Sequence, residues 1–403
     1  MKILYYNWGS NSNIDICQTF TNLNIEYDMW QHELSNYEHD VRFSENLQKK
    51  LEEKEYDCIF SFDYIPLLSY AAKERGILYY AWIYDCPQFT LFSDSVYNSC
   101  NRIFFFDRVQ YQYFVNRGVG NAFHLPLAVN VNKFKDLCSI PSENMDIHEK
   151  SNLDISYWHD VSFIGNLYNA NMYNKIKYLP PYLKGYLDGL INSQFNIYGY
   201  NMFPELLTDG IVSELDKYIS LDDSVEIRLP HSMIYENMLY DKIAEIERKE
   251  VLLRCVKYAD VFLYTGSDAS EILDIENSMH KIKVMPPVDY DTQLPEIYRH
   301  TKINLNITCR SITSGMPLRV LDIMGSGGFL LSNYQPELAE YFIPGEEVVL
   351  YESMSDMENK VKYYLSHDEE RIAIAQKGCR KVREQFSYEN MVRKMLKIED
   401  LQQ

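Results

Sequence analysis

Residues Ser311–Asn333 read SITSGMPLRVLDIMGSGGFLLSN and predict a loop, a short helix and a strand in close succession. The run KINLNITCRS, which leads into this stretch, alternates apolar and polar residues, as a strand with one buried face does. Pro317 suits the first position of a helix, because its missing N–H would have no partner there. We therefore expect a helix over Pro317–Met324, ended by a glycine cluster, and a strand over Phe329–Ser332. Such a unit is typical of a parallel α/β sheet.

The amino end of this short helix can bind an anion, because free N–H groups and the helix dipole place positive charge there. Gly315 lets the backbone approach a ligand closely, and Arg310 and Arg319 offer cationic hydrogen bonds that suit phosphate oxygens. Asp322 follows Arg319 by one helical turn, where a carboxylate can bind a ribose diol. The pattern indicates a nucleotide donor with a diphosphate. On composition alone, an ordinary turn followed by a surface Arg–Asp pair explains it equally well.

The rest of the chain carries two series of strands and helices. In the first series the expected strands are Lys2–Asn7, Ile25–Gln31, Asp57–Phe62, Ile77–Ile83, Arg102–Phe106 and Ala122–Leu125. A second series starts at Asp160 with DVSFIGN and continues with strands at Val261–Tyr264, Lys281–Met285, Ile303–Ile307, Phe329–Ser332 and Val348–Tyr351. Each half of the chain therefore predicts a Rossmann-like α/β domain.

The length of 403 residues also suits two domains. A polar segment between Val131 and His159 lacks periodicity and marks the connection. We expect an amino-terminal Rossmann-like domain with this linker over residues 1–155 and a carboxy-terminal Rossmann-like domain over residues 156–385. A helical insertion should span about 172–258, because that tract is far longer than a crossover helix needs. A last helix within residues 386–403 should pack back on the first domain.

Charge and composition exclude several classes of partner. The formal net charge of −19 at pH 7 argues against nucleic acid and against electrostatic docking on anionic lipid. The sequence has no run of about 20 apolar residues, so we expect no integral membrane segment. Its amino terminus lacks the pattern of a signal peptide, and its eight cysteines lack C-x-x-C spacing. We therefore expect a cytoplasmic protein without a disulfide framework or a zinc site.

The run SGMPLRVLDIMGSGGFLLSNYQPEL, with DVSFIGNLY, KINLNITCRS and WIYDCPQFTLF, resembles the CgeB-like, spore-maturation-protein-like glycosyltransferases of the GT-B superfamily. The resemblance covers most of the chain and is most specific over Ser314–Asn333. It implies two Rossmann-like domains that face a cleft. A nucleotide-sugar, favoured as a UDP-sugar, would bind the carboxy-terminal domain, and a protein or cell-envelope glycan acceptor would lie against the other domain. The resemblance implies no cofactor besides this co-substrate.

The resemblance also assigns donor-binding residues. Many retaining GT-B enzymes place two glutamates in the spacing E-x7-E around this helix; Asp322 stands at the second position, which implies a ribose contact, and Ser314 at the first. Because a serine supplies no negative charge, retention of configuration does not carry over. The turn Gly165-Asn166 resembles the loop that approaches the donor phosphates, and Val288 and Tyr290 lie in the loop that usually recognises the base. Plain strand-ending turns remain the alternative for both loops.

Glycosyl transfer also needs a group that accepts a proton from the acceptor. Asp85 is our candidate, because it ends the apolar run ILYYAWIY at the carboxyl end of a strand. His124 is the second candidate, although a structural histidine in an apolar strand explains it too. Asp63 ends another strand and has a similar claim, whereas Asp107 suits a helix cap.

The tripeptide Asp289-Tyr290-Asp291 matches the D-x-D metal signature of the other glycosyltransferase fold, but that fold has a single nucleotide domain near the amino terminus. We expect a metal-independent enzyme. Two other functions stay open at this stage: a GT-B-type sugar-nucleotide epimerase or hydrolase, which needs no acceptor, and a catalytically weak nucleotide-sugar-binding subunit.

Overall fold

The computed structural model describes residues 1–403 except 132, 134–155, 222–226, 274–278 and 398–403. The chain divides into two compact units. The first unit contains Met1–Ala128, Ser220–Ile234 and Tyr388–Gln403, and the second contains Val129–Ile219 and Tyr235–Ser387. We expected the domain boundary between residues 155 and 156, and residue 155 lies outside the described residues.

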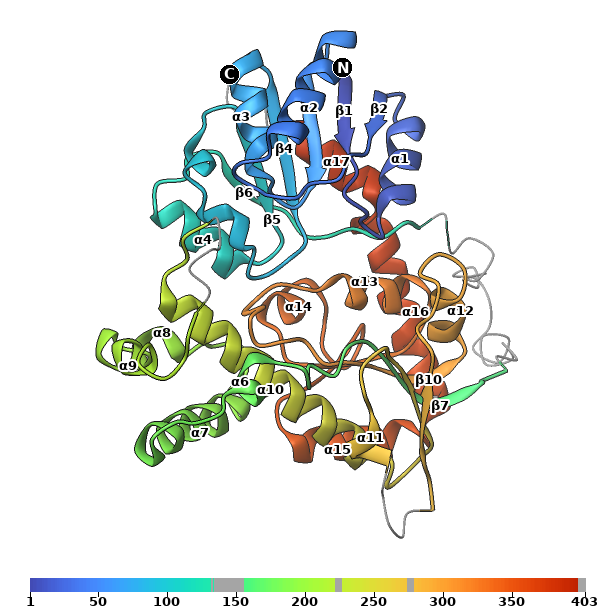
Figure 1. Cartoon of the computed structure of the whole chain (residues 1–403). Coiled ribbons are helices and arrows are strands. Elements are labelled where there is room, and N and C mark those ends of the chain that lie inside the picture. Colours follow the sequence, from blue (N-terminus) through green and yellow to red (C-terminus); the bar gives the residue numbers. More distant parts are fainter. Residues whose placement is uncertain (132, 134–155, 222–226, 274–278, 398–403) are drawn as a thin grey trace. The chain divides into compact units, whose positions relative to one another are not determined.

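A parallel six-stranded sheet in the order β2-β1-β3-β4-β5-β6 forms the centre of the first unit (Figure 1). Its strands are β1 (Lys2–Tyr6), β2 (Glu26–Trp30), β3 (Cys58–Phe62), β4 (Leu78–Ile83), β5 (Asn101–Phe105) and β6 (Ala122–His124). Its helices are α1 (Asn13–Asn22), α2 (Val41–Glu53), α3 (Pro66–Arg75), α4 (Arg108–Asn116) and α17 (Tyr388–Lys397), with 3-10 turns at Phe89–Phe92 and Asp94–Tyr97.

Local sequence explains the helices of the first unit. Asp40 caps α2 by accepting the N–H of Phe43 at 2.9 Å, and the buried residues Phe43, Leu47 and Leu51 recur every four residues on one face. Helix α3 ends at Gly76, whose φ of 67° is a left-handed conformation that glycine adopts without strain. These helices cover a core of aliphatic and aromatic side chains from every strand between β1 and β6 except β2.

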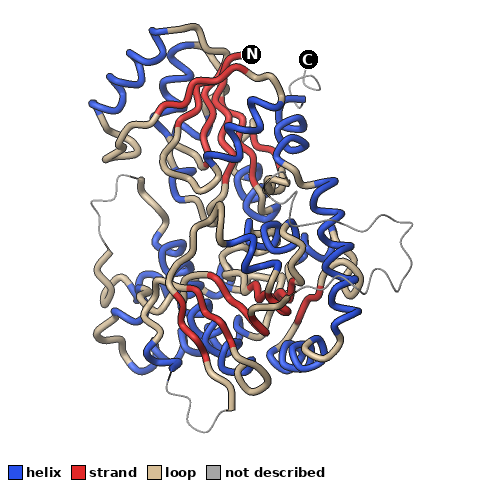
Figure 2. Tube along the Cα trace, turned by 90° about the vertical axis from the view of Figure 1, so that its right-hand side faces the viewer, coloured by secondary structure: helices blue, strands red, loops and turns tan. Residues whose placement is uncertain are grey.

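The second unit has a second parallel six-stranded sheet, in the order β12-β11-β10-β7-β8-β9. Its strands are β7 (His159–Ile164), β8 (Val261–Tyr264), β9 (Ile282–Met285), β10 (Thr301–Asn306), β11 (Leu330–Asn333) and β12 (Val349–Tyr351). The helices after β8 are α11 (Ser270–Leu273), α12 (Leu294–Arg299), α13 (Leu318–Gly325), α14 (Pro336–Tyr341), α15 (Met354–Tyr364) and α16 (Asp368–Gln385). Two parallel α/β sheets confirm the predicted Rossmann-like fold of each half; Figure 2 shows the strands gathered in two sheets.

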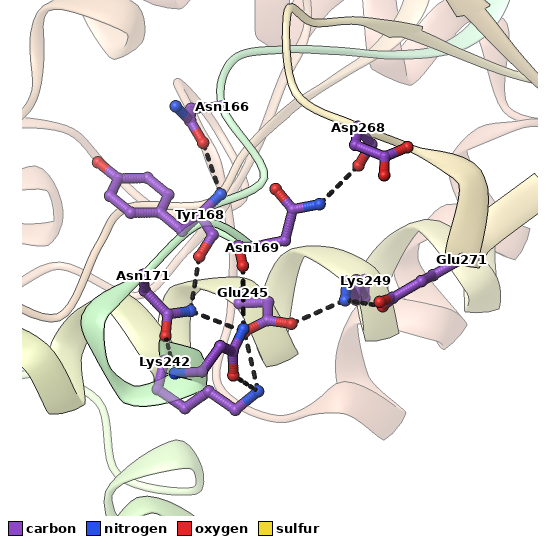
Figure 3. A network of polar contacts seen from close by, with 10 residues as sticks. Asn166, Tyr168, Asn169, Asn171, Lys242, Glu245, Lys249, Asp268 and Glu271 are labelled. Carbon is purple, nitrogen blue, oxygen red and sulfur yellow. Dashed lines mark hydrogen bonds and ion pairs between the residues drawn. The ribbon is translucent and has the colours of Figure 1, made fainter. Parts of the chain in front are cut away.

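A helical tract separates β7 from β8. It contains α6 (Met172–Lys175), α7 (Pro181–Phe195), α8 (Phe203–Leu206), α9 (Asp209–Leu215) and α10 (His231–Cys255). Glu245 on α10 ties the start of this tract to the long helix (Figure 3), because it accepts hydrogen bonds from Asn171 and Asn174 and pairs with Lys242 and Lys249. Burial alone would raise the pKa of Glu245, but these four partners lower it to about 2.

The topology decides where each sheet can bind a ligand. In a parallel sheet the crevice opens at the carboxyl ends of the strands, at the point where the strand order reverses. That point lies between β1 and β3 in the first unit and between β7 and β10 in the second unit. Over the described residues, none of the helices combines the length and the apolar character that crossing a membrane requires.

Candidate functional site

The loop after β7 meets helix α13 at the carboxyl edge of the second sheet. A Cβ atom on Gly165 would lie 2.7 Å from Nη2 of Arg319, so the glycine lets this guanidinium lie against the loop in its present position. Arg319 donates to Oδ1 of Asn306, at the end of β10, at 3.3 Å. The structure thus brings the predicted residues Gly165 and Arg319 together across the switch point between β7 and β10.

Arg248 on α10 is a second guanidinium at this place, and the sequence did not single it out. It is 4% exposed and donates to the backbone carbonyl oxygens of Asn166 and Ile307, which follow β7 and β10. Both Arg248 and Arg319 lie 5.3 Å from the centre of the Phe163 ring. Burial, followed by the charge of Arg319, lowers the pKa of Arg248 to about 10.

Neither guanidinium forms an ion pair with a carboxylate among the described residues. Two cations held close together, neither of them in an ion pair with a described carboxylate, favour the binding of an anion between or beside them, because an anion reduces their repulsion. This is the position of the loop Gly165-Asn166, for which we predicted contact with donor phosphates.

Asp322 and Tyr290 also come together. The Tyr290 hydroxyl donates to the Asp322 carboxylate, with distances of 3.1 and 3.3 Å to its two oxygens. Asp322 is only 5% exposed and lies on α13, one turn after Arg319. Tyr298 interacts with both Arg319 and Asp322, and burial is the main cause that raises the pKa of its hydroxyl. A cation, a carboxylate and a phenol therefore form one cluster at the carboxyl edge of the sheet.

The two aspartates that flank Tyr290 have partners within the second unit. Asp289 accepts the N–H groups of Asp291 and Thr292 at 3.2 and 2.8 Å and the Thr292 hydroxyl at 2.6 Å, so it caps the turn. Asp291 pairs with Lys133 at 2.5 Å, and the ammonium of Lys133 lies 4.6 Å from the Tyr290 ring centre. The D-x-D run thus serves the local loop in this structure. No group of three or more His, Cys, Asp or Glu side chains suited to a metal occurs among the described residues.

Ser314 has a carboxylate as its neighbour, although it stands where an acid was expected. Its hydroxyl donates to Oε1 of Glu337 at 2.7 Å, and the N–H of Glu337 donates to the Ser314 carbonyl oxygen at 3.0 Å. Glu337, in the first turn of α14, is 1% exposed. Sequence spacing could not reveal this pair, because 23 residues and a strand separate the two side chains.

The guanidinium of Arg310 lies inside the second unit with partners of its own. It pairs with Glu247 at 3.2 Å, donates to the carbonyl oxygen of Phe195 at 3.2 Å, and lies 3.7 Å from the Tyr198 ring centre. Arg310 and Glu247 are both more than nine-tenths buried. This geometry is that of a buried ion pair, so any donor contact by Arg310 would compete with Glu247.

The other predicted donor residues lie as follows. Gly315 is buried in the loop before α13, and Val288 is half-buried in the loop after β9. Pro317 takes the cap position, one residue before the first residue of α13, where we had expected it to be the first helical residue. Asn166 is exposed and accepts from the Tyr168 N–H and the Ser267 hydroxyl at 2.6 and 3.1 Å.

A pocket of about 710 Å³ opens beside Asn166 at the ends of β7 and β8. Its lining residues are Asn166, Asn169, Ala170, Gly266, Ser267, Asp268 and Glu271, several of which Figure 3 shows. Of the predicted donor-binding residues it includes Asn166 and none of the α13 residues. Its walls come from the segments that follow β7 and β8.

In the first unit, Asp85 lies beside Asp63 at the carboxyl ends of β3 and β4. Oδ1 of Asp63 accepts the N–H groups of Tyr84 and Asp85 at 2.8 and 3.1 Å. Burial, and then the charge of Asp85, raises the pKa of Asp63 from 3.8 to about 7. Asp85 is exposed at the edge of a pocket, yet loss of part of its hydration raises the pKa of its carboxyl as well. The sequence therefore identified two carboxylates that the fold places together.

His124 ends β6 and is half-buried, with its ring 6.2 Å from that of Tyr111. It is not among the residues that line the pocket beside Asp85. Asp107 caps α4 by accepting the N–H of Gln110 at 2.8 Å, which confirms its predicted capping role.

Comparison with known proteins shows what these units resemble. Residues 248–397 match the family model described as glycosyl transferase-like. An uncharacterized protein of Aquifex aeolicus (strain VF5) is 23% identical over 125 residues, which are 30% of this chain and 31% of that protein. The chain thus matches about a third of the length of this curated relative.

Solved structures extend the similarity to the whole fold. Sucrose-phosphate synthase from Thermosynechococcus elongatus has a TM-score of 0.56 at 10% identity, over 100% of this chain and 98% of that chain. Anabaena HepE in complex with UDP-glucose has a TM-score of 0.55 at 11% identity, over 99% of both chains. A glycosyltransferase from Rickettsia africae has a TM-score of 0.52 at 10% identity, over 98% and 97%. The chain therefore has the two-domain GT-B fold, and its residues 248–397 are similar to the glycosyl transferase-like family.

Proposed function

We propose that this protein is a glycosyltransferase that takes a sugar from a nucleotide-sugar donor bound at the carboxyl edge of the second sheet. The cluster of Tyr290, Asp322 and Arg319 carries this proposal. Asp322 would hold the ribose hydroxyls, and Arg319, beside Gly165, would hold the diphosphate. The buried guanidinium of Arg248 adds positive potential behind the same loop.

A UDP-sugar is the favoured donor. Anabaena HepE, which shares the fold, is described in complex with UDP-glucose and with UDP. The acceptor class, a protein or a cell-envelope glycan, rests on the sequence resemblance. Metal independence is part of the proposal, and it is supported by the engagement of Asp289 in its turn and of Asp291 with Lys133.

Asp85 is the proposed base. As the acceptor oxygen bonds to the anomeric carbon, the bond from that carbon to the diphosphate oxygen breaks, and the diphosphate leaves with the electron pair. Asp85 would take the proton of the acceptor hydroxyl. Arg319 and the amino end of α13 would stabilise the charge that forms on the leaving diphosphate.

A thermal-shift screen with UDP-, GDP-, dTDP- and CMP-sugars, each with and without EDTA, tests the donor site. We expect one nucleotide class, UDP, to raise the melting temperature regardless of EDTA. Asp322→Asn should abolish the shift, because the ribose hydroxyls lose their charged acceptor. Asp160→Asn is the matched control, since Asp160 pairs with Lys302 near the opposite end of β7.

Two results would contradict the proposal. If no sugar nucleotide stabilises the wild-type protein, the donor site is wrong. If the shift requires a divalent cation, metal independence is wrong and the D-x-D run becomes the candidate metal site. Hydrolysis of the donor at full rate without any acceptor would instead favour a hydrolase.

A further inference from the structure

A pocket of about 780 Å³ lies at the carboxyl edge of the first sheet, within the first unit. Its walls come from the segments after β1, β2, β3 and β4, so it spans the point where the strand order reverses. The lining residues are Tyr6, Asn7, Trp8, Gln31, His32, Glu33, Leu34, Tyr37, Asp63, Tyr64, Ile65, Asp85, Pro87, Gln88, Phe89 and Thr90. No donor-binding residue proposed above belongs to this set.

Aromatic side chains form the apolar part of the pocket. Trp8 and Tyr37 are each 45% exposed and line the same pocket, so two large aromatic side chains gather at one place. The indole N–H of Trp8 donates to the carbonyl oxygen of Phe62 at 2.8 Å, and this bond fixes the ring at the end of β3. Large aromatic faces held open in a crevice favour a ligand that has apolar faces of its own.

The polar part of the pocket is acidic. Asp63 is 6% exposed, and its Oδ1 accepts two backbone N–H groups. Its Oδ2 accepts no hydrogen bond from the described residues, and the carboxylates of Asp85 and Glu33 line the same space. Lysine and arginine do not occur among the described lining residues, where His32 is the one side chain that can become cationic, so a phosphorylated or carboxylated ligand would meet the like charges of Asp85 and Glu33.

We propose that this pocket binds an uncharged saccharide unit, which is the acceptor sugar if the proposed transferase function holds. A pyranose combines apolar C–H faces, which suit Trp8 and Tyr37, with hydroxyl donors that suit the free oxygens of Asp63 and Asp85. The side-chain amides of Gln31 and Gln88 also line the pocket and carry donors as well as acceptors. Hydroxyl groups use both, whereas an organic cation uses acceptors alone.

Saturation-transfer NMR on the full chain tests this inference with lactose, maltose and cellobiose as probes. Glucose 6-phosphate is the anionic comparison and choline is the cationic comparison. We expect signals from at least one neutral disaccharide and at least a fivefold weaker signal from glucose 6-phosphate. Tyr37→Ala should reduce the disaccharide signal at least fivefold. Trp8→Ala is a second variant, and Tyr97→Ala is the matched control, because Tyr97 is 53% exposed in the same unit but does not line the pocket.

The outcomes test the saccharide pocket and the proposed donor site separately. If no disaccharide gives a signal that depends on Tyr37, or if choline alone does, the saccharide assignment is overturned. Stabilisation by UDP reports on the second unit independently. Loss of the disaccharide signal with an intact UDP shift refutes only this inference, whereas a disaccharide signal without any nucleotide shift refutes the proposed donor site.

Discussion

Protonation of the Asp63 carboxyl group, in the first-unit pocket, affects the stability of the fold. Its pKa of about 7 lies above the ordinary value of 3.8, so the folded protein holds a proton that the unfolded chain releases between these values. Stability is therefore lost as pH rises from about 4 to about 7, by roughly 2–4 kcal/mol in full. The other carboxylates that line its pocket are Asp85 and Glu33, and His32 is the histidine there.

We expect Asp63→Asn to stabilise the protein more at pH 8 than at pH 5, because the amide keeps the acceptor oxygen without the buried charge. Chemical denaturation at both pH values measures the difference. Asp94→Asn, at an exposed position of the same unit, is the control for the removal of a carboxyl group that is not buried. An equal effect of Asp63→Asn at the two pH values would show that the carboxyl group titrates normally.

Arg310 and Glu247 predict a stability effect that is separate from donor binding. Glu247→Gln leaves a buried guanidinium without its counter-charge, so we expect a loss of about 3–5 kcal/mol in the free energy of unfolding. Glu250→Gln, on the same helix, removes a partly exposed pair with Arg254 and should cost less than about 1 kcal/mol. Stabilisation by UDP should persist in folded Glu247→Gln. If UDP no longer stabilises folded Glu247→Gln, Arg310 contacts the donor, as the sequence suggested.

At single positions the sequence identified residues whose chemistry is local to one motif. Asp322, Arg319 and Gly165 could be selected because each belongs to a recognisable strand end or helix start. Arg248 and Glu337 could not, since their roles arise from contacts with residues far away in the chain. Arg248 lies inside a long helix whose sequence shows charged residues on several faces and no motif.

At the scale of elements, two glycines in helices have opposite surroundings. Gly378 on α16 packs so closely that an added Cβ would clash with the backbone carbonyl of Glu347 and lie 2.8 Å from Cε of Met324 on α13. Gly185 on α7 has no atom within 4 Å of such a position.

We expect Gly378→Ala to destabilise the protein by about 1–3 kcal/mol or more, because α16 must move away from the backbone at Glu347. Gly185→Ala should instead stabilise it by about 0.5–1 kcal/mol, since alanine restricts the unfolded chain and favours the helix. Denaturant midpoints of both variants give the comparison. Equal effects would mean that helix propensity, and not the packing of α16 against the Glu347 backbone, decides the outcome.

Strands were the most predictable elements, because short apolar runs between turn residues define them well. The expected strand Ile303–Ile307 corresponds to β10 (Thr301–Asn306), and Val261–Tyr264 matches β8 without a shift. Strand order could not be read, since it depends on which side of the sheet each crossover takes. The exact start of α13 was also missed, as Pro317 can occupy either the cap or the first helical position.

At the scale of the whole molecule, the chain does not complete one unit before it enters the other. It passes from one unit to the other four times, at residues 128–129, 219–220, 234–235 and 387–388. The last passage delivers α17 to the first unit, where Asn22 of α1 donates to Glu389 at 3.1 Å and the Tyr84 and Tyr388 hydroxyls lie 2.7 Å apart. The sequence indicated two domains, but it gave no signal for the segment Ser220–Ile234.

We expect Met391→Gln to destabilise the first unit by about 1–3 kcal/mol, because Met391 is 1% exposed and the new amide would be buried. Lys394→Gln, on the exposed face of the same helix, is the control and should have little effect. Limited proteolysis should cut residues 1–128 faster in Met391→Gln, while the response of the second unit to UDP remains. An unchanged cleavage pattern would show that α17 contributes little to the first unit.

The guanidiniums of Arg248 and Arg319, which form no ion pair with a carboxylate in the part of the chain that the structure describes, have a practical consequence for anyone who purifies this protein. A pair of cations selects for doubly charged oxyanions in general, so phosphate in a purification buffer should occupy the place of the donor diphosphate. Affinities for nucleotide sugars measured in phosphate buffer should therefore be weaker than those measured in HEPES. Residual pyrophosphate should act as a competitor.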